Sequence, residues 1–128
     1  MTARFEAGHQ LRGDFGPATL PHRHAYRVDV TARGQHLRRD GTLLDIGRLQ
    51  AALASCVGEL DGKNMDQLDA FGGENTTAER VAEHVWRSLA AELRAAPGVA
   101  ELRVAVYESA DAWAAVDRSL GSSTDDAA

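Results

Sequence analysis

The chain has little of several residue types that mark particular classes of protein. A single cysteine among 128 residues excludes an intramolecular disulfide and fits a reducing compartment. No apolar run approaches the roughly 20 residues of a membrane-spanning helix, and the first residues lack the pattern of an export signal. The 14 basic side chains are outnumbered by 19 acidic ones, and a net charge of −5 argues against a nucleic-acid-binding face. We therefore expect a cytoplasmic protein without a membrane or nucleic-acid partner.

The chain does have enough apolar residues for one hydrophobic core. They make up 44% of the sequence, which suits a single domain of ordinary size. We assign this domain to residues 1–118. The remaining segment 119–128, SLGSSTDDAA, is small and polar, so we expect it to be disordered.

Residue periodicity predicts the secondary structure. Alternating apolar and polar residues predict strands over 3–11, 22–34, 100–109 and 112–117, and helical spacing predicts helices over 46–60 and 75–96. Asp45 is placed to cap the first helix, and Thr76 with Glu79 has capping-box spacing for the second. This order predicts an α+β fold in which two helices cover one face of a four-stranded antiparallel sheet. Such a sheet exposes two edges, so we expect subunits to assemble.

Three histidines have the parity of the apolar strand faces. His22 and His24 point the same way because they are two residues apart on a strand, and His9 can face them if the first two strands pair. Three imidazoles with one open position match the ligand count of a catalytic zinc site, although imidazole also suits iron, copper and nickel. The spacing alone fits equally well two polar residues at the end of a sheet.

A carboxylate also has the parity of a core face. Glu108 continues the face of the apolar residues at positions 102, 104 and 106, so its carboxylate is expected to be partly buried and to need a partner. Either Glu108 anchors a ligand with paired N–H donors, or it reaches solvent from the end of its strand. Cys56 lies in the middle of a predicted helix among apolar neighbours and is predicted to belong to the core.

Six segments, in order, resemble the family of 6-pyruvoyltetrahydropterin synthase and 6-carboxytetrahydropterin synthase, which has the tunnelling fold (T-fold). They are FEAGH, HRHAYRVDV, DGTLLDIGRL, ELDGKNMDQL, ENTTAERVAEHVW and VAVYES, and they run through nearly the whole chain. The resemblance implies Zn²⁺ bound by His9, His22 and His24. It implies that Glu108, aided by Thr77, holds the pterin-like ring of a small-molecule substrate. It also implies a homo-oligomer, a trimer or a hexamer, whose subunits close into a barrel.

Two positions depart from the family pattern. Ala18 stands where the family has its catalytic cysteine, and Gly62 stands where it has the histidine of its LDH segment. A positioned acid–base group typically contributes about 10²–10⁴-fold, so the ordinary reaction should be crippled unless other groups replace these two. The candidate replacements are Asp61, a zinc-bound hydroxide and Lys63, the chain's one lysine. Of the two interpretations of Lys63, a solvated loop charge is favoured over a proton carrier.

Three functions fit this combination of retained and lost residues. The favoured one is a zinc-dependent lyase, isomerase or cyclase in specialised metabolism, acting on a small carbonyl or hydroxylated substrate, with Asp61 and Lys63 as proton carriers. The second is a true 6-pyruvoyl- or 6-carboxytetrahydropterin synthase with substitute catalytic groups. The third is a non-catalytic pterin- or purine-binding protein, which the retained Glu108 would suit equally well.

Overall fold

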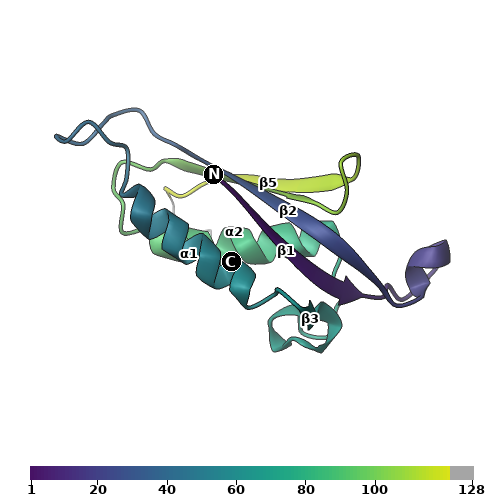
Figure 1. The fold of residues 1–128 in the computed structure, drawn as a ribbon. Helices are drawn as coiled ribbons and strands as arrows, with labels where there is room; N and C mark the ends of the chain where they lie inside the picture. Colours follow the sequence, from purple (N-terminus) through teal and green to yellow (C-terminus); the bar gives the residue numbers. More distant parts are fainter. Residues whose placement is uncertain (122–128) are drawn as a thin grey trace.

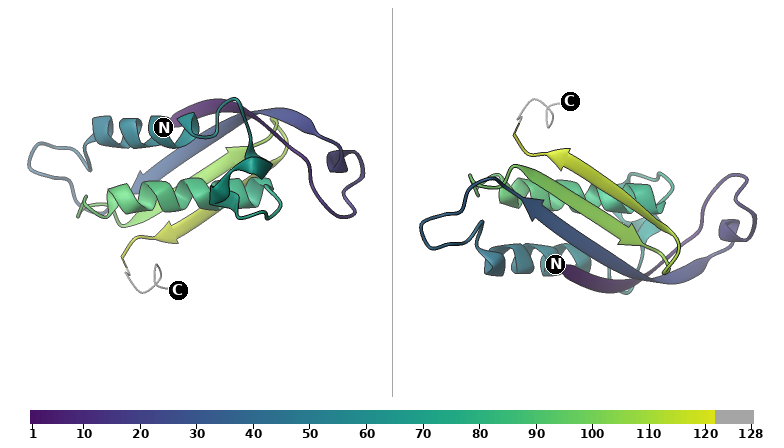
Figure 2. Two further views of the ribbon diagram at one scale, coloured as in Figure 1. Left: turned by 90° about the horizontal axis from the view of Figure 1, so that it is seen from below. Right: turned by 90° about the horizontal axis from the view of Figure 1, so that it is seen from above.

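The computed structural model describes residues 1–121 and contains one sheet with both helices on the same face (Figures 1 and 2). The main strands are β1 (Thr2–His9), β2 (His22–Arg33), β4 (Glu101–Tyr107) and β5 (Trp113–Ser119). They run antiparallel in the order β1-β2-β4-β5, which confirms the predicted four-stranded antiparallel sheet. A two-residue strand, β3 (Lys63–Asn64), adds to the outer edge of β1 in parallel.

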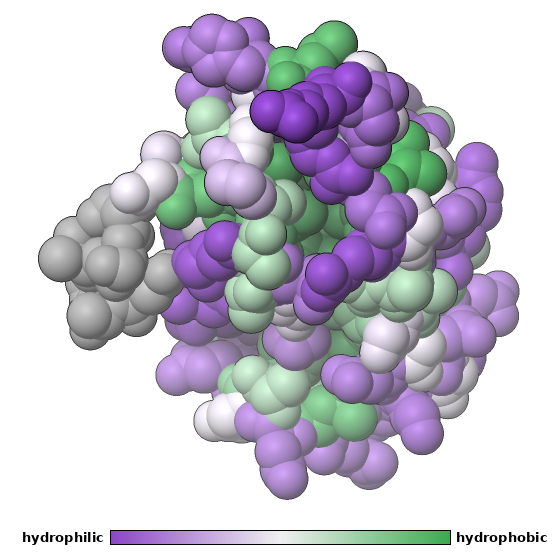
Figure 3. All heavy atoms as spheres, turned by 90° about the vertical axis from the view of Figure 1, so that its left-hand side faces the viewer, coloured by the Kyte–Doolittle hydropathy of each residue, from purple (hydrophilic) through white to green (hydrophobic). Residues whose placement is uncertain are grey.

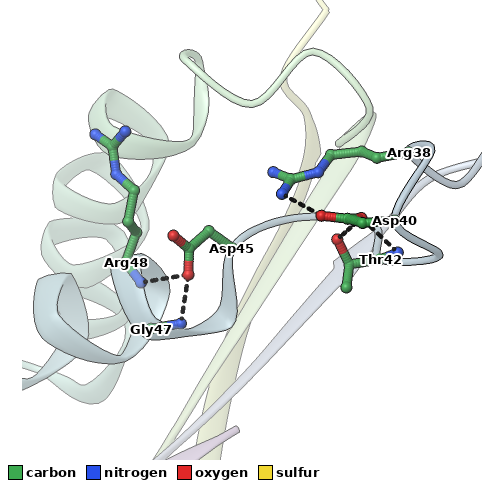
Figure 4. A network of polar contacts seen from close by, with 6 residues as sticks. All are labelled: Arg38, Asp40, Thr42, Asp45, Gly47 and Arg48. Atoms are coloured by element: carbon green, nitrogen blue, oxygen red, sulfur yellow. Dashed lines mark hydrogen bonds and ion pairs between the residues drawn. The ribbon is translucent and has the colours of Figure 1, made fainter.

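Capping residues begin both helices. Before α1 (Ile46–Gly58), Asp45 Oδ1 accepts from the backbone N–H groups of Gly47 and Arg48 at 2.9 and 3.4 Å, as predicted (Figure 4). Before α2 (Ala78–Leu93), the cap is Thr77, whose hydroxyl oxygen accepts from the Arg80 N–H at 3.3 Å. The predicted capping box of Thr76 and Glu79 is therefore wrong by one residue, because the Thr76 hydroxyl contacts His9 and Asp66.

The core lies between the helices and the facing side of the sheet. Its fully buried members alternate along the strands and follow one stripe of α2: Val28, Val104, Val106, Val81, Val85 and Leu89. Trp86 crosses from helix to sheet and donates its indole N–H to the Leu102 carbonyl at 2.8 Å. Cys56 belongs to this core, as predicted, and burial raises the pKa of its thiol, which keeps it protonated and unreactive.

The ordered fold continues past the predicted domain boundary. Ser119 is the last residue of β5, and Leu120 is buried, so the structured part reaches at least Leu120. The rest of the segment expected to be disordered, from residue 122 onward, lies outside the described residues. Within residues 1–121 no helix is both long and apolar enough to cross a bilayer.

A hollow of about 730 Å³ lies at the end of the sheet where β1 begins. Apolar residues from β2, α1 and the loop before α1 line it, and charged residues of that loop surround it (Figure 3). In the same loop, Asp40 accepts hydrogen bonds from Arg38 and Thr42 (Figure 4). The histidines are at the other end of the sheet, because β1 runs away from the hollow toward His9.

Candidate metal centre

Strand pairing brings the three histidines together. β1 and β2 pair antiparallel with His9 directly opposite His22, and His24 follows two residues along the same face. The ring centroids are separated by 4.4 Å for His9 and His22, 5.1 Å for His9 and His24, and 4.8 Å for His22 and His24. One ring nitrogen from each histidine lies within 4.8 Å of the other two. The expectation that His9 can face the pair is therefore confirmed in the structure.

Backbone carbonyls set the tautomers of two of these rings. His9 Nδ1 lies 2.9 Å from the Thr76 carbonyl oxygen, and His22 Nδ1 lies 2.8 Å from the Leu20 carbonyl oxygen. A carbonyl can only accept, so in both rings Nδ1 carries the proton and donates it. Each neutral ring then has its lone pair on Nε2, the atom that is left for a metal.

The donor set fits a metal ion such as Zn²⁺. His9 is only 3% exposed, and its Nε2 is buried without a hydrogen-bond partner among the described residues. A buried nitrogen lone pair without a partner is costly, and a metal ion would satisfy it. Neutral imidazole is a preferred zinc ligand at about 2.0–2.1 Å, so small ring rotations would gather the three nitrogens around one ion. Three protein ligands are one fewer than the four that zinc usually takes, so water or substrate would supply the fourth.

Burial also keeps the third ring neutral. His24 is half-buried, and desolvation lowers its pKa. The negative charge of Glu108 opposes this shift, while the neighbouring His9 and His22 add to it. Next along the strand, the buried Tyr26 contacts His24 edge-on, with ring centroids 5.4 Å apart. Burial raises the pKa of Tyr26, with Glu108 and Asp66 adding to the shift, so the phenol keeps its proton.

The predicted substrate-binding residues lie near this cluster. Glu108 directly follows β4 and is half-buried, and its charge acts on both His24 and Tyr26. Its partial burial agrees with the parity argument. Thr77 is also half-buried, and its hydroxyl oxygen is the N-cap of α2, with its proton still available to donate.

The predicted proton carriers lie along the outer edge of β1. Asp61 is exposed, and its Oδ1 accepts from the Glu6 N–H at 3.0 Å, while the N–H of Gly62 donates to the Glu6 carbonyl at 2.7 Å. Lys63 pairs with Ala7 in β3 and is exposed, without an ion pair to any described residue. These contacts give Asp61 a structural task, and they place both side chains two to three residues before the end of β1.

The two positions that depart from the family pattern have small residues and local backbone contacts. Ala18 is half-buried in the loop before β2, where its carbonyl accepts from the Leu11 N–H at 2.8 Å. Gly62 has a left-handed backbone with φ 75°, and apart from its two chain neighbours no atom of residues 1–121 lies within 4 Å of the place a Cβ would take. Neither position carries a group that can move a proton.

Sequence reasoning missed Thr76, which contacts His9, and Asp66, which contacts Thr76. Thr76 is fully buried, and its hydroxyl oxygen accepts a hydrogen bond from His9 Nδ1–H at 3.1 Å. The same hydroxyl donates to Asp66 Oδ1 at 2.9 Å. The sequence pattern predicts a helix cap at Thr76, and Asp66 lies in a segment without periodicity. The contacts join residues 67 and 10 positions apart, and no local pattern indicates them.

Comparison with known proteins identifies the family. The family model described as 6-pyruvoyl tetrahydropterin synthase matches residues 1–119. The chain belongs to this family. Among curated relatives, the 6-pyruvoyl tetrahydrobiopterin synthase of Drosophila melanogaster is 33% identical over 75 residues, which cover 57% of this chain and only 45% of the fly enzyme.

Solved structures of the synthase family share the T-fold. The Caenorhabditis elegans 6-pyruvoyl tetrahydropterin synthase superimposes with a TM-score of 0.80 at 20% identity, covering 92% of both chains. The Plasmodium vivax enzyme gives a TM-score of 0.75 at 18% identity, covering 93% of this chain and 96% of that one. At these identities the likeness shows the fold, which agrees with the predicted α+β T-fold.

Proposed function

We propose that the chain is a zinc-dependent, lyase-type enzyme of the pterin synthase family whose acid–base residues differ from the family pattern. Its reaction is a lyase, isomerase or cyclase step on a small carbonyl or hydroxylated substrate, in specialised metabolism. The observation that carries this proposal is the cluster of His9, His22 and His24, in which two tautomers are set by backbone carbonyls and a buried Nε2 lacks a partner. Zinc bound there would polarise an oxygen atom of the substrate.

The substrate would be held next to the metal by protein side chains. Glu108 is half-buried beside His24 and would accept hydrogen bonds from paired N–H donors of a pterin-like ring. Thr77, at the start of α2, would donate its hydroxyl proton to the same ligand. The burial around Tyr26 and His9 would exclude water from the inner side of the site.

Proton transfer is assigned to groups on the β1 edge. Asp61 uses one carboxylate oxygen for the Glu6 N–H and would accept a substrate proton on the other. Lys63 lies two residues further on, opposite Ala7, and would return the proton. Ala18 and Gly62 have no ionisable side chain, so Asp61 and Lys63 are the proposed proton carriers.

The second candidate is a true 6-pyruvoyl- or 6-carboxytetrahydropterin synthase with substitute groups. The 33% identity to the fly synthase favours it. One solved variant of the P. vivax synthase replaces a glutamate described as a catalytic residue, so a carboxylate takes part in that enzyme's reaction. By the same chemistry, a carboxylate of this chain would replace the missing cysteine.

Metal content and turnover test the proposal directly. Purified wild-type protein is expected to contain one zinc ion per chain by elemental analysis, and His22→Ala is expected to lose both the metal and the turnover. His36→Ala, at an exposed loop position, is the matched control. Incubation with dihydroneopterin triphosphate and a panel of small hydroxycarbonyl compounds, read by mass spectrometry, separates the two candidates. Full activity in metal-free protein would refute the zinc-dependent enzyme, and tight binding without turnover would indicate a binding protein.

Assembly into a homo-oligomer is part of the proposal. The outer edge of β5 has no neighbouring strand among the described residues, and β3 covers only Ala7 and Gly8 of β1. Unpaired edges favour strand pairing between subunits, which would close a trimer or hexamer into a barrel. We place the protein in the cytoplasm, with its small-molecule substrate and further copies of itself as its partners.

A further inference from the structure

Asp66 is two hydrogen bonds away from a proposed metal ligand. Its Oδ1 lies 2.9 Å from the Thr76 hydroxyl oxygen, and that oxygen lies 3.1 Å from His9 Nδ1. A carboxylate can only accept, so the Thr76 hydroxyl donates to Asp66 and turns a lone pair toward the N–H of His9. His9 therefore donates to the Thr76 hydroxyl oxygen, and the Thr76 hydroxyl donates to Asp66.

The carboxylate of Asp66 is held from another side as well. Its Oδ2 accepts from the backbone N–H of Gln10, the residue that directly follows His9, at 2.8 Å. Its own backbone N–H donates to Asn64 Oδ1 at 3.0 Å. The Asp66 carboxylate thus links the end of β1 to the segment before α2, and the Asp66 backbone N–H binds Asn64. Since Thr76 is fully buried, these hydrogen bonds act in a medium of low dielectric constant, where they are strong.

We propose that Asp66 and Thr76 are positioning residues for the metal. They hold His9 as its Nδ1–H tautomer and aim its Nε2 lone pair at the other two histidines. The inference rests on the proposed function, because it takes His9, His22 and His24 as zinc ligands. Adjacent threonines then have separate roles: Thr76 supports the metal ligand, while Thr77 caps α2 and faces the substrate.

The expected size of the effect follows from the contacts of His9. Loss of a hydrogen-bond partner of a ligating histidine typically lowers metal affinity 10–100-fold. The Thr76 carbonyl, 2.9 Å from His9 Nδ1, remains in every side-chain variant. We therefore expect the lower end of that range, a loss of about tenfold, for Asp66→Asn and for Thr76→Val.

Zinc affinity is measured by competition with a chromogenic chelator, using the full chain at a pH where histidine is neutral. Asp66→Asn and Thr76→Val should each bind zinc about tenfold more weakly than wild type. Thr76→Ser, which restores the hydroxyl, should regain wild-type affinity. Asp69→Asn, which removes an exposed carboxylate from the next turn of the same loop, should also match wild type.

Several outcomes would overturn the inference. If Asp66→Asn and Thr76→Val are folded by circular dichroism and bind zinc like wild type, the positioning role is refuted while the proposed function stands. An equal loss in Thr76→Ser, which keeps the hydroxyl, would assign the effect to disturbed packing at this buried position and would refute the role of the hydroxyl. If Asp66→Asn does not fold, the comparison of Thr76→Val with Thr76→Ser decides the question. Failure of the wild-type protein to bind zinc would refute the proposed function itself.

The tautomer gives a readout that does not depend on metal. In ¹⁵N–¹H correlation spectra of the metal-free wild-type protein, His9 should carry its proton on Nδ1 and none on Nε2. A proton on Nε2 of the neutral ring would refute the arrangement from which the inference starts.

Discussion

The sharpest test of the proposed departures at Ala18 and Gly62 is to introduce the residues that the family resemblance implies there. Ala18→Cys would place a thiol in the loop four residues before His22, and Gly62→His would place an imidazole next to Asp61. There is room for the imidazole, because apart from the two chain neighbours no atom of residues 1–121 lies within 4 Å of a Cβ built at Gly62. The left-handed backbone there, with φ 75°, should lower the free energy of unfolding by about 1–2 kcal/mol.

The contribution of single acid–base groups sets limits on the gain in rate expected of the double variant Ala18→Cys with Gly62→His. A positioned acid–base group contributes about 10²–10⁴-fold, and groups that act as a unit do not add independently, so the double variant should gain a factor in that range rather than its square. The assay follows tetrahydropterin formation from dihydroneopterin triphosphate by mass spectrometry, with Gly62→Ala as the control for backbone strain and Ala18→Ser as the control for the thiol. A folded, zinc-loaded double variant with the wild-type rate would refute the placement of Ala18 and Gly62 at the family's reactive positions.

Three further predictions concern stability and assembly. Burial lowers the pKa of His24 and His84 below 6.5, so as the pH falls the unfolded chain binds more protons than the folded chain does. The urea midpoint of the metal-free protein should therefore drop as the pH is lowered from about 7.5 to 5.5. A constant or rising midpoint would contradict this. Trp86→Phe removes the donor to the buried Leu102 carbonyl and should cost about 1–3 kcal/mol by chemical denaturation, whereas an unchanged stability would show that water replaces the indole. Light scattering after gel filtration should give the mass of a trimer or hexamer, because among residues 1–121 no strand pairs with the outer edge of β5 and β3 covers only two residues of β1. A monomer at micromolar concentration would count against the barrel.

Much of the site could be predicted from parity along the strands. Side chains two residues apart on a strand point to the same face, so the grouping of His22, His24 and Tyr26 needed no knowledge of the fold. The same rule placed Glu108 on the core side, where the structure finds it half-buried. Only the pairing of β1 with β2 had to be assumed to add His9, and the register puts His9 directly opposite His22.

Features that depend on contacts between distant segments had no such pattern. β3 has two residues, too few for alternation, and forms because the Asp61 carboxylate and the Gly62 N–H bind the backbone of Glu6. The cap of α2 was displaced by one residue because two adjacent threonines offer the same hydroxyl, and only the position of His9 decides that Thr76 turns inward.

Periodicity and residue chemistry are local properties, so the elements, the faces of the strands and the histidines proposed as metal ligands could be read from the sequence. The tautomer of His9 and the groups that support it depend on the tertiary structure. The tautomer of His9 depends on a carbonyl and a hydroxyl 67 residues away, and on a carboxylate from a third segment. Hydrogen bonds between such segments are set when the sheet and helices pack, since packing alone brings those atoms within 3 Å or so of each other.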